Sequence, residues 1–347
     1  SPGDGLVRPL GTSNVWVKNC MVHDAPMDCD VIKIGASNVL IENCIIYNAA
    51  HRTDGVSYQE CIDTYGTSPV PDGVTVRGCW IFHTADKGGD YLIYAKGGSK
   101  NVLWENNVFG PSGGYGNVAT GCGAASPEVF PSCENFIARN NLFLGCKGDG
   151  MFGFTGAKNA YVYNNVFYNY SSNNPKAMIQ FYSAQPSGSA PQRDRNQDCY
   201  VFNNIFMQSN GYPVYLDRGG WTPGVTYVPA NVEHDYNLYY LCNTSPSSND
   251  VDVTAEANSV CNVNPQFALA AVPVPFTDTW SSVAANFVIA GGSPAEDAGA
   301  DLSAGAPYNV LTDIMGTARP ANAAYDMGAY EIPEYARPAL LAEYCDP

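Results

Sequence analysis

The sequence predicts an all-β fold, a right-handed parallel β-helix with three strands per coil and a less regular C-terminal segment. Three observations predict it: a seven-residue phrase that recurs along the chain, an alternation of apolar residues within each copy, and 34 glycines with 24 prolines. Glycine and proline at this level suit short strands and many turns rather than long helices. Hydrophobic residues make up 45% and charged residues 14% of the 347-residue chain, which excludes disorder and a charge-rich helical array.

The repeated phrase sets the length of one coil. Start-to-start spacings between copies are 24, 35, 28, 34, 24 and 39 residues, so the unit is a coil of 24 residues with variable insertions. The copies occupy residues 14–20, 38–44, 73–79, 101–107, 135–141, 159–165 and 198–204.

Each copy reads as a half-buried strand followed by a bend. Alternate residues are apolar, as at Val39 and Ile41, and polar side chains such as Glu42 stand between or after them. Asn at the bend tolerates the left-handed conformation and bonds its own backbone. A second short strand follows the bend, and a third apolar stretch precedes most copies. These third stretches lie at 31–34, 62–65, 92–95, 151–154, 179–182 and 214–216.

Equivalent residues of successive coils should stack at the strand spacing of about 4.8 Å. The last position of the repeat would then form a ladder of three cysteines followed by four asparagines. The three cysteines are equally compatible with free buried thiols and with disulfides. Pairs inside single loops, Cys122 with Cys133 and Cys242 with Cys261, are better disulfide candidates. The ladder reads Cys20, Cys44, Cys79, Asn107, Asn141, Asn165 and Asn204.

Charge and cysteine usage limit the partners and the compartment. The net charge of −16 argues against nucleic acid, which is bound by clustered Lys and Arg. No apolar run approaches the roughly 20 residues of a membrane span. Twelve cysteines without a C-x-x-C pair favour disulfides over metal ligation, and therefore an extracellular protein, secreted or at the cell surface.

The coil phrase resembles that of secreted right-handed β-helix proteins of the pectate-lyase-like superfamily. The tail is similar too: residues 292–299, 313–316, 319–320 and 326–331 resemble a C-terminal segment of bacterial secreted β-helix proteins. The resemblance implies coils over residues 1–240 and an irregular capping segment over 241–347 that packs on the helix. It implies an extracellular polysaccharide as partner, held on one strand face between long loops, here the insertions at 49–60, 67–72, 110–133 and 184–197.

The segment 90–101 resembles the lysine-bearing strand of some β-helix lyases, which suggests Lys96 as a catalytic base. Lys33 stands in an equivalent strand two coils earlier and is a second catalytic candidate. Acidic residues precede or open the same strands and could converge as oxygen ligands for Ca²⁺. The predicted metal ligands are Glu60, Asp63 and Asp90, with Asp30 beside them, and the predicted substrate contacts are Tyr65, Tyr94 and His83.

Three functions remain open. The first is a polysaccharide lyase that cleaves an acidic glycan by β-elimination. The second is a structural or adhesive protein that stacks end to end through its N-terminal end. The third is a carbohydrate-binding module without chemistry. The lyase pattern places an Arg one coil beyond Lys96, and residues 114–133 contain neither Arg nor Lys.

The N-terminal end lacks an obvious cap, since residues 1–13 contain no amphipathic helix before the first repeat. Either the chain is a fragment, or these residues form an irregular plug, or another molecule covers this end. The last alternative would allow self-association into a filament.

Overall fold

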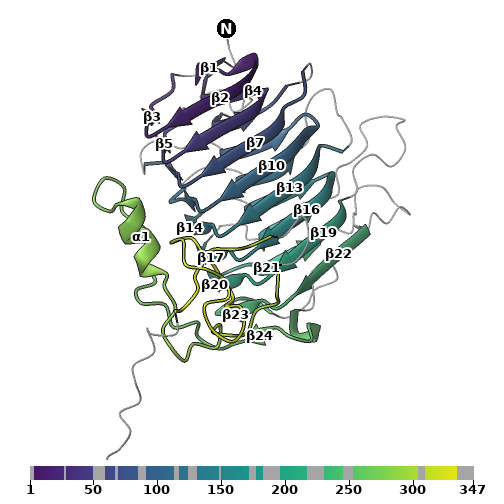
Figure 1. Ribbon diagram of the computed structural model, residues 1–347, viewed down its shortest axis with the longest axis vertical. Coiled ribbons are helices and arrows are strands. Elements are labelled where there is room, and N and C mark those ends of the chain that lie inside the picture. Colours follow the sequence, from purple (N-terminus) through teal and green to yellow (C-terminus); the bar gives the residue numbers. More distant parts are fainter. Residues whose placement is uncertain are drawn as a thin grey trace, which may run out of the picture.

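The computed structural model describes residues 4–26, 29–49, 59–66, 69–84, 91–112, 117–123, 131–147, 150–171, 177–182, 196–216, 230–244, 253–303 and 309–333. Within these ranges the chain winds into a right-handed parallel β-helix (Figure 1). The named strands pair in parallel, and they form one sheet of 15 strands and one of nine. The predicted fold class is confirmed.

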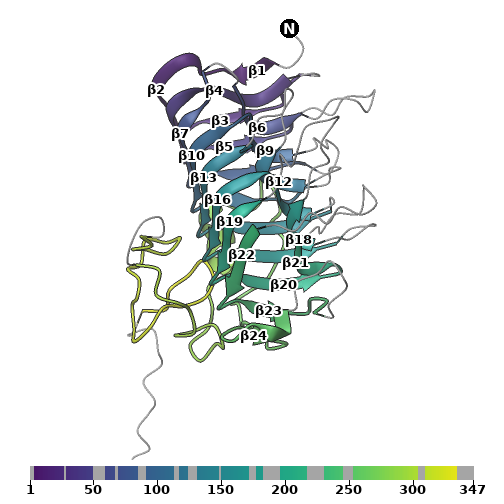
Figure 2. The same cartoon turned by 90° about the vertical axis from the view of Figure 1, so that its right-hand side faces the viewer.

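Each coil contributes strands to three faces, which we name A, B and C (Figure 2). Face A holds β1 (Asp4–Val7), the start of β4 (Cys29–Glu42), β6 (Glu60–Thr64), β9 (Tyr91–Lys96), β12 (Asn117–Gly123), β15 (Gly150–Thr155), β18 (Ala177–Tyr182) and β21 (Tyr212–Leu216). Face B holds β2 (Leu10–Lys18), the end of β4, β7 (Asp72–Arg77), β10 (Ser99–Glu105), β13 (Cys133–Arg139), β16 (Ala157–Tyr163), β19 (Gln197–Phe202) and β22 (Ala230–Asp235). Face C holds β3 (Met21–His23), β5 (Ile45–Tyr47), β8 (Trp80–Phe82), β11 (Val108–Phe109), β14 (Leu142–Cys146), β17 (Val166–Tyr170), β20 (Ile205–Ser209), β23 (Leu238–Tyr240) and β24 (Val260–Cys261). Faces A and B belong to the same sheet of 15 because β4 runs from one to the other.

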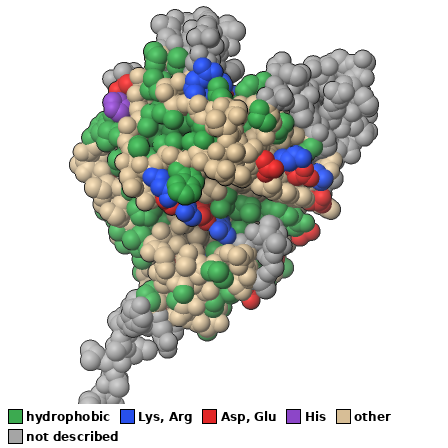
Figure 3. Space-filling model, turned by 45° about the horizontal axis from the view of Figure 1, so that its top comes forward, with side chains coloured by type: hydrophobic (Ala, Val, Ile, Leu, Met, Phe, Trp, Pro, Cys, Tyr) green, Lys and Arg blue, Asp and Glu red, His purple; other side chains and the backbone are tan. Residues whose placement is uncertain are grey.

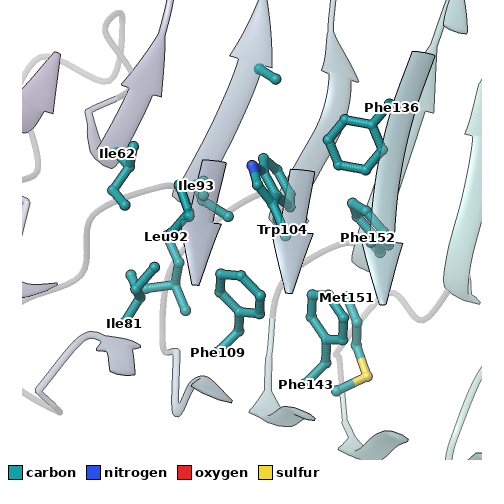
Figure 4. Packing of buried hydrophobic residues seen from close by; sticks show 14 of the residues in the cluster. Ile62, Ile81, Leu92, Ile93, Trp104, Phe109, Phe136, Phe143, Met151 and Phe152 are labelled. Atoms are coloured by element: carbon teal, nitrogen blue, oxygen red, sulfur yellow. The ribbon is translucent and has the colours of Figure 1, made fainter. Parts of the chain in front are cut away.

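Stacked apolar side chains fill the space between the faces. Phe109, Phe143, Phe167 and Phe206 of face C lie one above another, with ring centroids 4.7–5.0 Å apart in near-parallel planes. Ile62, Ile93 and Phe152 of face A and Trp104 and Phe136 of face B point into the same interior, together with Phe109 and Phe143 (Figure 4). Like side chains stack because parallel strands in register place equivalent residues one strand spacing apart.

The asparagine ladder forms as predicted. The Asn141 carboxamide oxygen accepts the backbone N–H and the side-chain N–H of Asn107, both at 3.0 Å. The same pattern continues through Asn165 and Asn204, each residue fully buried. The paired residues before the ladder, such as Asn140, have positive φ, which confirms the left-handed bend.

An eighth ladder residue, Asn237, was missed in the sequence. It accepts the backbone N–H of Asn204, and its own N–H is bonded to the Ser259 hydroxyl. That hydroxyl in turn donates to the Glu256 carboxylate. Its coil escaped notice because His234 stands where other copies carry an apolar residue, and Tyr236 stands where most of them carry the first asparagine of the pair.

The cysteines divide into one disulfide and several thiols. Cys122 and Cys133 form the predicted disulfide, with their Cα atoms 5.2 Å apart. The predicted pairing of Cys242 with Cys261 is wrong, because Cys242 retains a free thiol whose Sγ lies 3.5 Å from the Phe206 carbonyl oxygen. Burial raises the pKa of that thiol to about 12. The ladder cysteines are thiols as well.

The chain beyond β24 packs against the outer side of face C (Figure 1). This segment contains α1 (Trp280–Asn286), and η1 (Val253–Ala255) precedes β24. Val283 and Phe287 join a second apolar cluster with the outward residues Leu142 and Val166 of face C. The division into 1–240 and 241–347 stays a prediction, and β24 adds a face C strand beyond residue 240.

A buried ion pair holds the C-terminal segment together. The Arg319 guanidinium contacts the Glu331 carboxylate at 2.7 Å and donates to the carbonyl oxygens of Asp326 and Gly328. The Asn164 side chain, at a bend of the helix, donates to those same two carbonyl oxygens. Asn164, the first asparagine of its repeat's Asn-Asn pair, therefore links the β-helix to the C-terminal segment.

The first coil is built from strands rather than an irregular plug. Asp4–Val7 pairs with β4, and β2 already begins at Leu10. The alternative that residues 1–13 form an irregular plug is therefore wrong for residues 4–7 and 10–13. Within the described residues, β1, β2 and β3 each pair along one side only. Leu6, Trp16 and Met21 of this coil are 48%, 72% and 56% exposed. Self-association through this end stays a prediction.

The outer side of face B carries alternating charges. Glu42 lies between Lys18 and Arg77, and Arg139 donates to Glu105, each on a neighbouring coil. Figure 3 shows blue and red side chains interspersed on this side of the molecule. Such alternation neutralises like-charge repulsion between stacked residues and offers no single-sign patch.

Candidate functional site

The first three described strands of face A that follow β1 bring five charged side chains together. Lys33 on β4 pairs in register with Asp63 on β6. Asp30 and Glu60 open the same two strands, and Lys96 ends β9 immediately before a turn in which Gly97 and Gly98 have positive φ. We name Asp30, Lys33, Glu60, Asp63 and Lys96 the face A charge cluster.

Asp63 lies at the centre of this cluster, between two ammonium groups. Its Oδ2 is 3.2 Å from the Nζ of Lys33, and its Oδ1 is 3.3 Å from the Nζ of Lys96. Lys33 also contacts Asp30 at 3.2 Å, and Lys96 contacts Glu60 at 3.1 Å. The order of charges is thus Asp30, Lys33, Asp63, Lys96, Glu60.

The carboxylates are buried, whereas the two lysine side chains are partly exposed. The side chains of Asp30 and Asp63 are 2% and 1% exposed, whereas those of Lys33 and Lys96 are 19% and 18% exposed. The groups that a solute can contact here are therefore the cations. Charges buried to this degree persist only when they are paired.

The pKa values of Glu60, Asp30 and Lys96 are all raised, through burial or through neighbouring charges. Burial raises the pKa of Glu60 well above its usual range, the Lys96 charge opposes this, and Asp63 and Asp30 raise it further. Burial and the Asp63 charge raise the pKa of Asp30. Burial lowers the pKa of Lys96, but the charges of Asp63 and Glu60 more than offset this, so the pKa is raised above its usual range.

Two tyrosines accompany the lysines. The Tyr65 ring centroid lies 5.8 Å from the Nζ of Lys33 and 5.7 Å from that of Lys96. Tyr94, which pairs with Asp63, places its ring centroid 4.6 Å from the Nζ of Lys96. Burial raises the pKa of Tyr94 to about 12, so its hydroxyl is protonated. These contacts are cation–π interactions.

His83 is buried rather than placed on the outer side of face A. It is 2% exposed, and its Nδ1 lies 3.9 Å from the Cys61 sulfur. Burial lowers the pKa of His83 to about 4 and raises that of Cys61 to about 12, so both groups are neutral. This geometry does not support the predicted contact of His83 with a substrate.

Asp30, Glu60 and Asp63 could hold a metal ion. Each offers one carboxylate oxygen, and the three oxygens lie within 4.8 Å of one another. The fit is only partial, because Lys33 and Lys96 already bind oxygens of the same carboxylates at 3.1–3.3 Å. A divalent cation would have to displace both ammonium groups.

The sequence identified most of this cluster but not its pairing. Lys33, Lys96, Glu60, Asp63, Tyr65 and Tyr94 come together as predicted, with Asp30. Asp90 lies outside the described residues, as do most of the insertions expected to wall the site. The pattern of strands could place lysines and carboxylates side by side, but it gave no sign that two lysines would share one aspartate.

Comparison with known proteins adds little to this description. No family model matches the chain, and no curated protein matches it. A solved structure described as the complex of XylC with xylose is similar over 92% of this chain, at 12% identity and a TM-score of 0.43. The match spans about half of that protein, 51% of its length. Among the described residues, no helix has the length and apolar character that crossing a membrane requires.

Proposed function

We propose that the outer side of face A binds an extracellular acidic polysaccharide. In this proposal Lys33 and Lys96 contact carboxylates of the glycan, and Tyr65 and Tyr94 contact its sugar rings. The observation that carries it is the partial exposure of the Lys33 and Lys96 side chains, 19% and 18%, beside carboxylates that are almost fully buried. The charged side chains of the cluster that an approaching anion can reach are therefore the two lysines.

The chain's net charge of −16 does not prevent such binding. Charges more than about 8 Å apart are largely screened at physiological ionic strength. The ammonium groups of Lys33 and Lys96 are joined through one carboxylate, so they act within that distance on the same ligand. Aromatic faces beside them add contact area for the apolar side of a sugar ring.

Affinity electrophoresis in gels containing a polyuronate tests the proposal. We expect the native chain to be retarded by the polyuronate and not by a neutral glucan, with retardation falling as salt rises. The double variant Lys33→Met/Lys96→Met should lose the retardation. Lys158→Met on face B is the matched control, because Lys158 also contacts a carboxylate, that of Glu134 at 3.0 Å. Equal retardation by both polymers, or in the double variant, contradicts the proposal.

The second candidate is cleavage of the bound glycan by β-elimination, with Lys96 as base. It is favoured by the two ammonium groups that flank Asp63, because elimination requires one cation to hold the substrate carboxylate and one group to exchange a proton. The raised pKa of Lys96 makes its neutral form scarce at neutral pH. The rate should therefore rise about tenfold per pH unit from neutral to alkaline pH.

Ultraviolet absorbance of the unsaturated product measures this reaction. We expect the native chain to form product at a rate that rises with pH and reaches no plateau below the usual lysine pKa. Lys96→Met should form no product. A rate independent of pH excludes Lys96 as base. Binding without any product leaves the first proposal standing and removes the second. Calcium, in either case, would have to displace the lysines to reach Asp30, Glu60 and Asp63.

A further inference from the structure

The three cysteines of the ladder form a second cluster, which consists of thiols instead of the charged groups of face A. Cys20, Cys44 and Cys79 occupy equivalent positions on three successive coils, because the residues on both sides of them pair in register. Cys44 and Cys79 are buried and Cys20 is exposed. All three are thiols.

The thiols do not replace asparagine in its hydrogen-bonding role. Between Asn107 and Asn141 one side chain receives two N–H groups at 3.0 Å, whereas the Cys44 N–H reaches the Cys79 sulfur at 3.4 Å. The Cys79 sulfur lies 3.3 Å from the Arg77 carbonyl oxygen. Sulfur is a weak acceptor and S–H a weak donor, so the turn gains little from having cysteine here.

We propose that Cys44 and Cys79 form a binding site for a soft monovalent metal ion of the Cu(I) class, which enters through the exposed Cys20. Thiolate ligands select such ions over hard cations. A zinc–thiolate bond is about 2.3 Å long, and two bonds of similar length to a Cu(I)-class ion, placed in line, would span about 4.6 Å. Neighbouring strands lie about 4.7–4.9 Å apart, so stacked sulfurs on adjacent coils are spaced for a two-coordinate ion between them.

The two ladder residues contact each other directly. The Cys44 and Cys79 side chains are hydrogen-bonded to each other, and the Cys44 N–H lies 3.4 Å from the Cys79 sulfur. Binding releases two thiol protons and leaves one ion joined to two thiolates.

Anaerobic titration with Cu(I) against a competing Cu(I) chelator tests the proposal, with bound copper counted per chain. The informative variants are Cys44→Asn and Cys79→Asn, because asparagine is the ladder residue at Asn107 and should preserve the turn. We expect each of these variants to bind one copper fewer than the native chain. Cys199→Ala is the control and should bind as the native chain does.

Two further measurements complete the test. Cys20→Ser should slow loading while leaving the final copper count unchanged. Bound Cu(I) should raise the unfolding temperature of the native chain and not that of Cys79→Asn. An unchanged copper count in Cys79→Asn overturns the proposal. So does mass spectrometry that finds Cys44 and Cys79 joined as a disulfide in protein purified without reductant.

Discussion

Replacement of Lys96 by methionine should destabilise the protein far more than the loss of an ordinary surface lysine. Lys96 contacts Glu60 at 3.1 Å and Asp63 at 3.3 Å, and both carboxylates are at most 2% exposed. At an effective dielectric constant of 20, one such contact is worth about 5 kcal/mol before desolvation is subtracted. Removing one partner of a buried pair costs about 3–5 kcal/mol, and because Lys96 is 18% exposed we expect the lower end, about 3 kcal/mol at pH 7.

The matched control is Lys158→Met. Lys158 contacts Glu134 at the similar distance of 3.0 Å, but the two side chains are 41% and 24% exposed. An exposed pair contributes about 0–1 kcal/mol, so the control should lose less than about 1 kcal/mol. Both values follow from urea unfolding, with the free energy of unfolding extrapolated to water.

The pH dependence identifies the cause. Without the Lys96 charge, which lowers the pKa of Glu60, this carboxyl group is more easily protonated in the folded state, so its folded pKa rises relative to the native chain. A group whose folded pKa is raised contributes stability below its unfolded pKa and loses it as pH rises through the folded pKa. The deficit of Lys96→Met should therefore be small near pH 4 and grow toward pH 8. Equal losses in both variants at pH 7, or a deficit that does not grow with pH, would refute the charge-cluster reasoning.

Three other perturbations have expected outcomes. Asn141→Ala removes four buried side-chain hydrogen bonds and should cost about 3 kcal/mol in urea unfolding, whereas Asn135→Gly on the exposed ladder should cost less than about 1 kcal/mol. Burial raises the pKa of Glu331 to about 7, so its contribution to stability is lost as pH rises through 7, and Glu331→Gln should flatten the stability curve between pH 6 and 8. Calcium should not shift the melting temperature of the native chain but should raise that of Lys33→Met/Lys96→Met, whose carboxylates are freed.

The architecture follows from the sequence because its signals are local and periodic. In each phrase the apolar alternation specifies a strand and the asparagine specifies a bend. Because the phrase recurs in successive coils, the same strand and bend form in each of them and stack. Asn237 shows the limit of this reasoning: its coil carries His234, whose Nδ1 contacts the Glu256 carboxylate at 2.6 Å, where other coils carry an apolar residue. A contact made by a residue more than 20 positions away gave no local signal.

The charge cluster shows why composition of a site is easier to predict than its chemistry. The strand pattern placed Lys33 and Lys96 on the same face as Asp63, because the spacing of the repeat fixes which residues share a face. It could not show that the carboxylates would be buried beneath the ammonium groups, because burial depends on neighbours from other coils. A lysine read as a base is therefore found with a raised pKa.

The pairing register of β4 aligns both the face A charge cluster and the cysteines of the ladder, so a change of register would disrupt both. Lys33 pairs with Asp63, and within the same strand β4 the residue Glu42 pairs with Arg77 on the opposite side of the coil. A slip of β4 by two residues would keep its apolar side chains facing inward, but it would separate Lys33 from Asp63 and bring Cys44 out of line with Cys79. The cost of burying either set of groups without its partner opposes such a slip. The polar groups therefore fix the register that the apolar core, which accepts Ile32 or Ile34 equally well, leaves underdetermined.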